Sequence, residues 1–539
     1  MVRTIRYAIL ALVMLGVISF LYISKRLNTK AGINVSPSRI LNVTLRYRDD
    51  DRCFVYLTYP SNSRMVNLIV WVHGGGFVGG SALGGISSKV IEFFSKNGFA
   101  VASVEYRLCP KVNWNQLLKD IADGIKIAYK YLSEKGIKVN LSIYVGSSAG
   151  AIAGAVLIYA PPNNTLDISS YFNGFVGFSG GYCAYYAASD PYEKTSKCHI
   201  TIDEMMPFGN RTLPPPRKVP ALLINGIYDS LLDKYAGKDN YNHHVACMAK
   251  WLRENGIDVS VVNLPTGHGT IKWLFAGSPT VLHALQTFLE RLGWKGKLRP
   301  LSDLVAYWSL DKLKGKPILD NLGIANGIVI GKLYSVKGVS GKAIFFNGSG
   351  YVKFGKDVTG LLGEFKEGSI SLWFKFEDVL DKERILPIFY LGIASEKERD
   401  NMFIIEIGHA KPNNRKLYVT WIINGRPVLC FDSGFNLEPG KWYHLVVVVS
   451  KKGNTAYLNG EELTKRHYNF GNSRMSLFLA DIPTKDMVAI GYGKTGNKIT
   501  TRFCKFYGVI DEVRIYSRPL TSQEIKQLYL DGIKKLTRS

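Results

Sequence analysis

Residues 146–150 read Gly-Ser-Ser-Ala-Gly, a G-x-S-x-G pattern that can place a serine nucleophile on a sharp turn. The apolar run 141–145 precedes the pattern, and the helix-forming run 151–158 follows it. A strand, a turn and a helix in this order strain the backbone at the serine, and small residues two positions away avoid a clash. The pattern also occurs by chance, so its support comes from the partners that such a serine requires. The sequence nominates Ser148 as a covalent nucleophile.

A base must take the proton of the serine hydroxyl before it can attack. His268 lies between two glycines, on a loop after the apolar run 259–264, where its side chain could point into a cleft. Other histidines fit this role less well, because His243 and His244 fall in a helical stretch and His283 lies on a helix. A single histidine is often structural, but the position of His268 makes it the candidate base.

An acid must in turn orient the base. Asp229 comes just after the short apolar strand predicted over 221–224, where an acid of this kind belongs. Aspartate at a strand end can also be an ordinary turn residue, and Asp233 is a nearby alternative. Asp229 is the preferred candidate.

Three consecutive glycines follow the buried-strand run 68–72, in the segment His73-Gly74-Gly75-Gly76-Phe77. Glycine runs weaken a fold through their conformational entropy, so three in a row need a reason. The segment is either a glycine-rich turn or a loop whose N–H groups approach a substrate oxygen. Its position upstream of the G-x-S-x-G pattern favours the second interpretation.

The segment from Leu68 to Trp294 resembles the α/β-hydrolase fold, in the branch related to hormone-sensitive lipase and its carboxylesterases. The resemblance rests on the segments 73–77, 104–108, 146–150, 225–229 and 267–268. It implies a mostly parallel sheet with helices on both faces. It also implies a triad of Ser148, Asp229 and His268, an oxyanion hole made by the N–H groups of Gly75, Gly76 and Ala149, and no cofactor or metal.

Two residues depart from the pattern of that family. Ser147 stands where an acidic residue usually precedes the nucleophile, and Glu105 stands where an aspartate is usual. These departures keep the chemistry but leave the substrate open, including xylan-type, feruloyl-type and peptide-like substrates. Residues 182–216 lack periodicity and are expected to form a cap that shapes the substrate pocket.

Beyond Lys297 the pattern changes to short strands separated by Gly and Asn, as in an all-β sandwich. Segments 307–311, 346–348, 457–460 and 508–516 resemble, in order, a laminin-G-like, concanavalin-A-like jelly roll over about 304–530. The resemblance implies a carbohydrate or protein ligand.

Few residues of this part suggest chemistry of its own. Hydrolytic relatives of the jelly roll carry a strand with clustered Glu residues, whereas the run 403–407 offers the single Glu406, so a second hydrolytic site is not expected. Trp373, Trp421 and Trp442 could stack on sugars but are interpreted as sandwich core. Asp311, Asp320 and Asp511 offer a weak hint of calcium binding, without tight loop spacing.

Residues 7–24 are 18 consecutive uncharged residues flanked by basic ones, which is just long enough to span a bilayer. A cleaved signal peptide is the alternative, but no A-x-A-like cleavage site follows. The domains expected are an anchor over 1–30, a hydrolase over 31–297 and a sandwich over 298–539. The catalytic body is expected outside the cytoplasm.

The chain carries 68 Lys and Arg against 43 Asp and Glu, a net charge of +25. The excess is spread over both halves and forms no block, so a nucleic-acid partner is not expected, whereas a membrane or polysaccharide surface is compatible. The seven cysteines show no metal-binding spacing. The pairs Cys183–Cys198 and Cys430–Cys504 are candidate disulfides, and buried free thiols are the alternative.

These features together predict a membrane-anchored serine carboxylic ester hydrolase with a C-terminal binding module. Its substrate would be a small-molecule or polymer-linked ester, and its sandwich would localise the enzyme without taking part in chemistry. Two alternatives stay open. One is a serine peptidase or amidase on the same fold, and the other is a non-catalytic surface adhesion protein.

Overall fold

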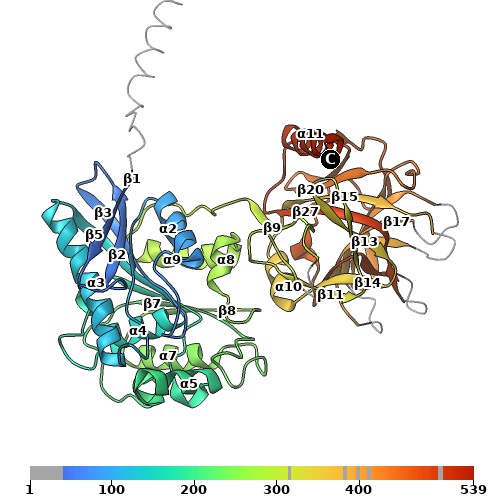
Figure 1. The fold of residues 1–539 in the computed structure, drawn as a ribbon. Coiled ribbons are helices and arrows are strands. Elements are labelled where there is room, and N and C mark those ends of the chain that lie inside the picture. Colours follow the sequence, from blue (N-terminus) through green and yellow to red (C-terminus); the bar gives the residue numbers. More distant parts are fainter. Residues whose placement is uncertain are drawn as a thin grey trace, which may run out of the picture.

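The computed structural model describes residues 40–313, 317–379, 385–395, 401–408, 414–495 and 502–538. Two bodies lie side by side, an α/β part followed by a β part (Figure 1). The predicted anchor of residues 1–30 lies outside these ranges, and no helix within them is long and apolar enough to cross a membrane.

One eight-stranded sheet organises the α/β part, in the order β1-β2-β4-β3-β5-β6-β7-β8. The pairs β1–β2 and β2–β4 are antiparallel, and every later pair is parallel. The strands are β1 (Ile40–Arg46), β2 (Phe54–Pro60), β3 (Met65–Val72), β4 (Ala100–Val104), β5 (Lys138–Ser147), β6 (Gly174–Phe178), β7 (Ala221–Gly226) and β8 (Val259–Leu264). The parallel strands end at a common edge, where loops can bring distant residues together.

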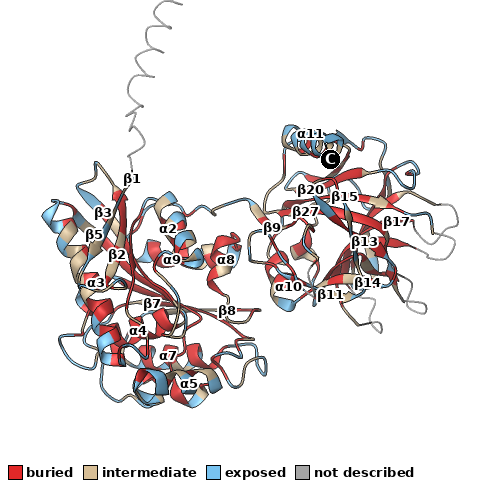
Figure 2. Cartoon of the chain, in the orientation of Figure 1, coloured by how far each residue is buried: buried red, intermediate tan, exposed pale blue. Residues whose placement is uncertain are grey.

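Helices cover both faces of this sheet because alternate strand residues point to opposite sides. On β3, Ile69 and Trp71 face one apolar core and Leu68 and Val70 face another. The first core includes residues of α2 (Gly85–Lys96), α8 (Ile271–Phe275) and α9 (Pro279–Arg291); the second includes α3 (Trp114–Glu134), α4 (Ala149–Tyr159) and α7 (His243–Glu254). Figure 2 shows the central strands buried between these helices. The mostly parallel sheet predicted from the sequence is confirmed.

Between β6 and β7 the chain forms a cap of short helices, as expected for residues 182–216. Its elements are η2 (Ala184–Tyr186), α5 (Ser189–Cys198) and α6 (Ile202–Met205), and η1 (Ser169–Tyr171) precedes β6. A capping box at the start of α6 links Thr201 and Glu204, so each side chain bonds the backbone N–H of the other.

The predicted disulfide pairs are wrong. Cys109 pairs with Cys198, and Cys183 pairs with Cys247, while Cys53, Cys430 and Cys504 are buried and lie outside any disulfide. The physical reason is that the chain between Cys183 and Cys198 folds into η2 and α5, so these residues face different neighbours. The observed bonds join the start of the cap to α7, and its middle, at the end of α5, to the loop after β4.

The β part is a sandwich of two antiparallel sheets, as predicted. One sheet follows the order β10 (Pro317–Ile318), β11 (Gly327–Gly331), β14 (Gly350–Phe354), β24 (Met487–Ile490), β16 (Leu386–Gly392), β17 (Met402–Ile407), β18 (Leu417–Ile423), β19 (Arg426–Asp432) and β23 (His467–Phe470). The other follows the order β12 (Tyr334–Lys337), β13 (Lys342–Asn347), β27 (Tyr507–Tyr516), β15 (Gly368–Phe376), β20 (Tyr443–Ser450), β21 (Gly453–Leu458) and β22 (Glu461–Glu462), with β9 (Leu304–Trp308) paired to β27.

Smaller elements complete the β part. They are the hairpin β25 (Tyr492–Thr495) and β26 (Arg502–Lys505), the short helix η3 (Leu479–Asp481), α10 (Lys356–Leu362) and the long helix α11 (Ser522–Arg538). The ring of Tyr529 on α11 stacks on that of Trp373 on β15, which places the helix on the outer face of its sheet.

The two parts share an apolar core, which the sequence did not predict. The buried Trp273 and Phe275 of α8 belong to the same cluster as Trp308 and Leu361 of the β part. The Ser278 hydroxyl donates to the half-buried carboxylate of Glu364 at 2.5 Å. Figure 1 shows α8 on the side of the α/β part that faces α10. The sandwich therefore packs directly behind the loop that follows β8.

Candidate active site

Ser148 lies at the turn between β5 and α4, with a φ of 54° that L-residues seldom adopt. The glycines of the pattern make this turn feasible. A Cβ at Gly146 would lie 2.6 Å from the carbonyl carbon of Gly150, and a Cβ at Gly150 would lie 2.1 Å from the carbonyl oxygen of Val72. Backbone strain at this position lifts the serine side chain out of the sheet edge.

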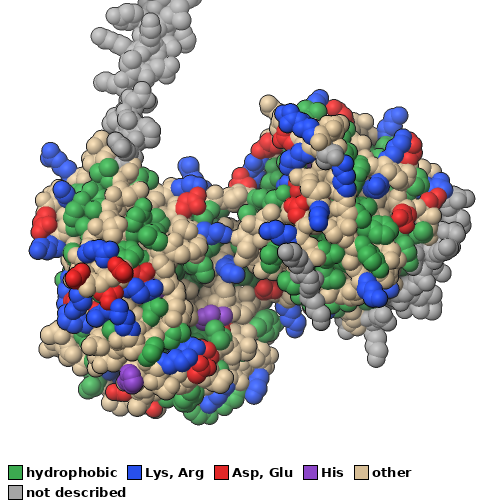
Figure 3. All heavy atoms as spheres, in the orientation of Figure 1, with side chains coloured by type: hydrophobic (Ala, Val, Ile, Leu, Met, Phe, Trp, Pro, Cys, Tyr) green, Lys and Arg blue, Asp and Glu red, His purple; other side chains and the backbone are tan. Residues whose placement is uncertain are grey.

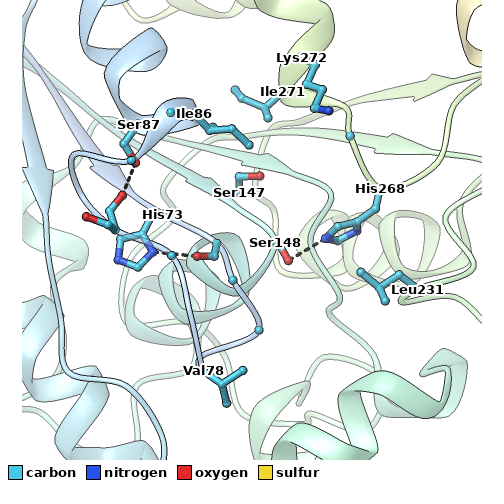
Figure 4. Close-up of a pocket in the computed structure, with 18 of the residues that line it drawn as sticks. His73, Val78, Ile86, Ser87, Ser147, Ser148, Leu231, His268, Ile271 and Lys272 are labelled. Carbon is cyan, nitrogen blue, oxygen red and sulfur yellow. Dashed lines mark hydrogen bonds between the residues drawn. The ribbon is translucent and has the colours of Figure 1, made fainter. Parts of the chain in front are cut away.

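Ser148, His268 and Asp229 lie in one hydrogen-bonded chain. The Ser148 Oγ is 2.8 Å from His268 Nε2, and His268 Nδ1 is 2.9 Å from Asp229 Oδ2. The Asp229 side chain is fully buried, whereas the His268 side chain is 26% exposed. Figure 4 shows the Ser148–His268 contact beside the glycine loop. The arrangement can move a proton from the serine hydroxyl to the imidazole while the carboxylate fixes the ring.

The loop that carries His268 is held by Ser179, a residue that the sequence analysis missed. The Ser179 hydroxyl donates to the backbone oxygen of His268 at 2.7 Å and lies 2.6 Å from the Thr270 hydroxyl. Ser179 follows the end of β6, at the same sheet edge as Ser148. A polar residue at a parallel-strand end was the available signal.

The alternative acid, Asp233, is used elsewhere. Its Oδ2 accepts the backbone N–H of His243 at 2.8 Å and lies 2.8 Å from Nδ1 of the same residue. His244 bonds the backbone N–H groups of Tyr182 and Cys183 through its Nδ1. His244 thus supports the cap, whereas His243 holds the loop after β7 through Asp233.

The glycine loop lies against the nucleophile. A Cβ at Gly74 would come within 2.9 Å of the Ser148 Cβ, so the two backbones are in close contact. Gly75 and Gly76 both have positive φ, at 123° and 60°. Ala149 begins α4, so its N–H has no partner within the helix. Of the predicted oxyanion residues, Ala149 directly follows Ser148, and Gly75 and Gly76 line the same cavity as Ser148.

Glu105, noted as a departure in the sequence, closes the glycine loop. Its carboxylate accepts the Ala82 N–H at 2.8 Å, lies 3.2 Å from His73 Nε2 and pairs with Arg52. Burial alone would raise the pKa of Glu105, but the hydrogen bonds from His73 and Ala82 and the charge of Arg52 outweigh it and lower the pKa. The residue stays ionised and joins both ends of the loop.

A cavity of about 670 Å³ opens over Ser148. The glycine loop, Ser147, Ser148 and His268 form its base. Its walls include side chains that the sequence did not single out: Ile86, Asp190, Lys194, Leu231, Ile271 and Lys272. In Figure 4, Ile271 and Lys272 lie on one side of the Ser148–His268 pair and Leu231 on the other.

A second, smaller cavity of about 50 Å³ also reaches Ser148. Ala149, Ile152, Met205 and Met206 line it, and the cap helices α5 and α6 form its far wall. Lys194 lies between the two cavities, with its ammonium 3.3 Å from Asp190 and its stem over Gly76. The site can therefore hold two groups on either side of the serine.

The residues considered for the sandwich do not form a comparable site. Trp421 is buried in the core of the sandwich, in line with the core interpretation. Trp373 is buried instead on the outer face of its sheet, beneath α11, and Trp442 is half-buried under the Lys375 ammonium. Asp311, Asp320 and Asp511 accept backbone N–H groups of other segments, which belong to Lys342, Tyr307 and Val339 respectively. Glu406 is buried on β17.

Metal ligands are not clustered in the part of the chain that the structure describes, where no three His, Cys, Asp or Glu side chains could share an ion. Lys and Arg are scattered over both parts on the face seen in Figure 3, with acidic side chains between them. The charge excess therefore shows no single basic patch on this face.

Two family models match this chain. Residues 55–175 match the BD-FAE family, and residues 346–526 match the family described as the concanavalin A-like lectin/glucanases superfamily. The chain therefore combines an esterase-like α/β-hydrolase domain with a laminin-G-type, concanavalin-A-like domain, and the resemblances found in the sequence are confirmed.

Individual relatives are more distant. A probable isoprenylcysteine alpha-carbonyl methylesterase of Arabidopsis thaliana is 28% identical over 144 residues, which cover 25% of this chain and 30% of that protein. This chain thus spans less than a third of the relative's length.

Solved structures resemble each part separately. Esterase B from Lactobacillus rhamnosis is 18% identical, with a TM-score of 0.36, over 51% of this chain and 93% of that one. Domain 4 of an extracellular arabinanase from Geobacillus stearothermophilus, in complex with arabinotriose, is 22% identical, with a TM-score of 0.29, over 42% and 98%.

Proposed function

We propose that this protein is a serine hydrolase that cleaves carboxylic esters. The observation that supports the proposal most strongly is the chain of contacts from Ser148 through His268 to Asp229, at 2.8 and 2.9 Å, beside a large cavity. The esterase-like family match over residues 55–175 agrees with it.

In this mechanism Ser148 attacks the ester carbonyl as its proton passes to His268 Nε2. Asp229 holds the ring and stabilises the imidazolium. The N–H groups of Gly75, Gly76 and Ala149 receive the negative charge of the tetrahedral intermediate. His268 then gives its proton to the leaving alcohol, and a water molecule releases the acyl group by the reverse steps.

The experiment is hydrolysis of a short-chain nitrophenyl ester together with labelling by a fluorophosphonate. Both signals should appear in the intact protein and vanish in Ser148→Ala. A parallel panel of peptide amides tests the amidase alternative. Absence of labelling and turnover in a folded protein would favour the adhesion alternative instead.

We further propose that residues 1–30 anchor the protein in a membrane, with the catalytic body outside the cytoplasm, and that the sandwich binds a carbohydrate or protein ligand. The basis for the anchor is the uncharged run 7–24. Alkaline washing of membranes from expressing cells tests it, because a peripheral protein is released and an anchored one stays. Binding of the intact protein to immobilised polysaccharides tests the sandwich ligand.

A further inference from the structure

Two cavities of very different size meet at Ser148. The large one, of about 670 Å³, and the small one, of about 50 Å³, share five lining residues: Gly76, Ser148, Asp190, Lys194 and Leu231. They differ in their remaining walls. His268 and Lys272 line only the large cavity, whereas Ala149 and Met206 line only the small one.

The position of His268 decides which part of an ester each cavity takes. If the proposed hydrolysis holds, His268 Nε2 must pass a proton to the oxygen of the departing alcohol, so that oxygen must lie beside the imidazole. The alcohol therefore extends into the large cavity, where His268 forms part of the wall. The carbonyl oxygen points to the oxyanion N–H groups, which leaves the small cavity for the acyl chain.

The walls of the small cavity leave little room to expand. Phe77, Ile152, Met205 and Met206 are each at most 4% exposed. The ring of Phe77 packs edge-on against that of Trp114, with their centroids 5.1 Å apart. The other boundary is the cap, where the disulfide at Cys198 ties the end of α5 to the α/β body.

The mouth of the large cavity is more open. Ile86 lines the large cavity but not the small one and is 43% exposed, so a group held there can extend into solvent. A bulky alcohol, including one that is part of a polymer, fits this side.

We propose that this protein removes short acyl groups from bulky alcohols. A cavity of about 50 Å³ holds roughly three to five water-sized groups. The acyl group it accepts thus contains about two to four carbons. This specificity is a property of the proposed esterase site and rests on that function.

The first test uses the intact protein and two isomeric alkyl esters, hexyl acetate and methyl heptanoate. Their bonds are of similar intrinsic reactivity, and they differ in which side of the carbonyl is long. We expect kcat/KM to be at least about tenfold higher for hexyl acetate, since misfit of even one methylene in a pocket has an effect of this size. Equal rates, or a preference for methyl heptanoate, would overturn the proposal.

A series of nitrophenyl acetate, butyrate and octanoate gives the second readout. We expect kcat/KM to fall by about tenfold or more between butyrate and octanoate. A protein that cleaves all three equally well is an esterase with a different acyl site. A protein that cleaves none and resists fluorophosphonate is no serine esterase, so the two failures are distinguishable.

Substitutions then show which residues limit the length of the acyl chain. Met206→Ala should enlarge the small cavity and raise the octanoate-to-acetate ratio by about tenfold. The control, Ile86→Ala, changes only the large cavity and should leave that ratio unchanged. A ratio that responds to Ile86→Ala but not to Met206→Ala would contradict the assignment. Met205→Ala provides the same test if Met206→Ala does not fold. The dependence of kcat/KM on acyl length in the unmodified protein tests the proposal without any variant.

Discussion

Each part of this molecule contains a serine–histidine pair, and the two pairs have almost the same length. Ser148 Oγ lies 2.8 Å from His268 Nε2 in the α/β part, and Ser371 Oγ lies 2.9 Å from His444 Nε2 in the sandwich. Their surroundings differ completely. Asp229 bonds the second ring nitrogen of His268, whereas Nδ1 of His444 is buried without a hydrogen-bond partner.

Access differs as well. His268 lines a cavity of about 670 Å³, while the His444 ring is stacked against Trp373 and Tyr529 and is only 1% exposed. Burial lowers the pKa of His444 to about 3, with a further contribution from the charge of Arg514. A ring that cannot accept a proton near neutral pH cannot serve as a base. A serine–histidine contact is therefore a candidate catalytic site only where an acid bonds the second ring nitrogen of the histidine and a cavity gives substrate access to the serine.

The comparison is tested most strongly by removing each serine. Ser148→Ala should lower kcat on a small ester by roughly 10⁴- to 10⁶-fold, as loss of a triad nucleophile does. Ser371→Ala should leave kcat unchanged, because no substrate can reach that buried hydroxyl. The measurement is steady-state hydrolysis of nitrophenyl butyrate.

The neighbouring serine gives a further control. Ser147→Ala should have little effect, and fluorophosphonate should still label Ser148. Covalent label on Ser147, or a large loss of activity in Ser371→Ala, would reverse the assignment.

The acid is the second difference between the pairs. Asp229→Asn should lower kcat by about 10⁴-fold, because an amide favours the wrong tautomer of the base. Asp233→Asn is the matched control. It loses the contact with His243 and should reduce stability while most activity remains. Stability is measured by thermal unfolding and activity by the same ester assay, and equal kinetic losses in both variants would contradict the role of Asp229.

The side chains that the sequence nominated for the α/β site lie together in the structure, and the reason is physical. Ser148, Asp229 and His268 are far apart in the chain, but each follows a strand of one parallel sheet, and the carboxyl ends of such strands meet at one edge. Apolar periodicity predicted the order of strands and helices. The position of these residues could therefore be inferred before any tertiary contact was known.

The internal packing of the cap could not be predicted in the same way. Its residues show no periodicity, so neither the pairing of Cys183 with Cys247 nor the placement of Met205 and Met206 beside Ser148 follows from local pattern. These features depend on how short helices pack on the finished body. The small cavity, and with it the basis of the proposed acyl specificity, could be found only in the structure.

The packing between the two parts was also missed, because both surfaces resemble ordinary core in the sequence. A Cβ at Gly360 of α10 would lie 2.5 Å from Pro265 and 3.3 Å from Trp273. These two residues flank the loop that carries His268. The sandwich thus supports the α/β part physically.

This support predicts a difference between residues 31–297 alone and the full chain. The shorter chain keeps the triad, so we expect it to hydrolyse a small soluble ester when folded. It exposes Trp273 and Phe275, which are 3% and 4% exposed in the full chain, so we expect a lower melting temperature. Circular dichroism establishes folding, and the ester assay is run well below the melting point.

A single substitution in the full chain examines the same contact. Gly360→Ala should push α10 from Pro265 and lower the melting temperature, by about 2–4 °C for each kcal/mol lost. A shorter chain that folds but cleaves no ester would show that the sandwich also positions His268.

The smallest expected effect concerns the pH dependence of stability. His444 is neutral in the folded protein down to a pKa of about 3, while its ordinary value is 6.5. Between these two values the unfolded chain binds a proton that the folded chain does not, so stability falls as pH falls through this window. The slope amounts to about 1.4 kcal/mol per pH unit at most.

His444→Phe keeps an aromatic ring between Trp373 and Tyr529 and removes the titrating group. The free energy of unfolding of the full chain, measured with urea, should therefore change less between pH 6.5 and pH 4 in this variant. His283→Phe removes an exposed histidine of α9 and should leave the slope as it is. An unchanged slope in His444→Phe would mean that the His444 ring is accessible to protons in the folded protein. The two serine–histidine pairs would then differ only in the acid, Asp229, that bonds His268.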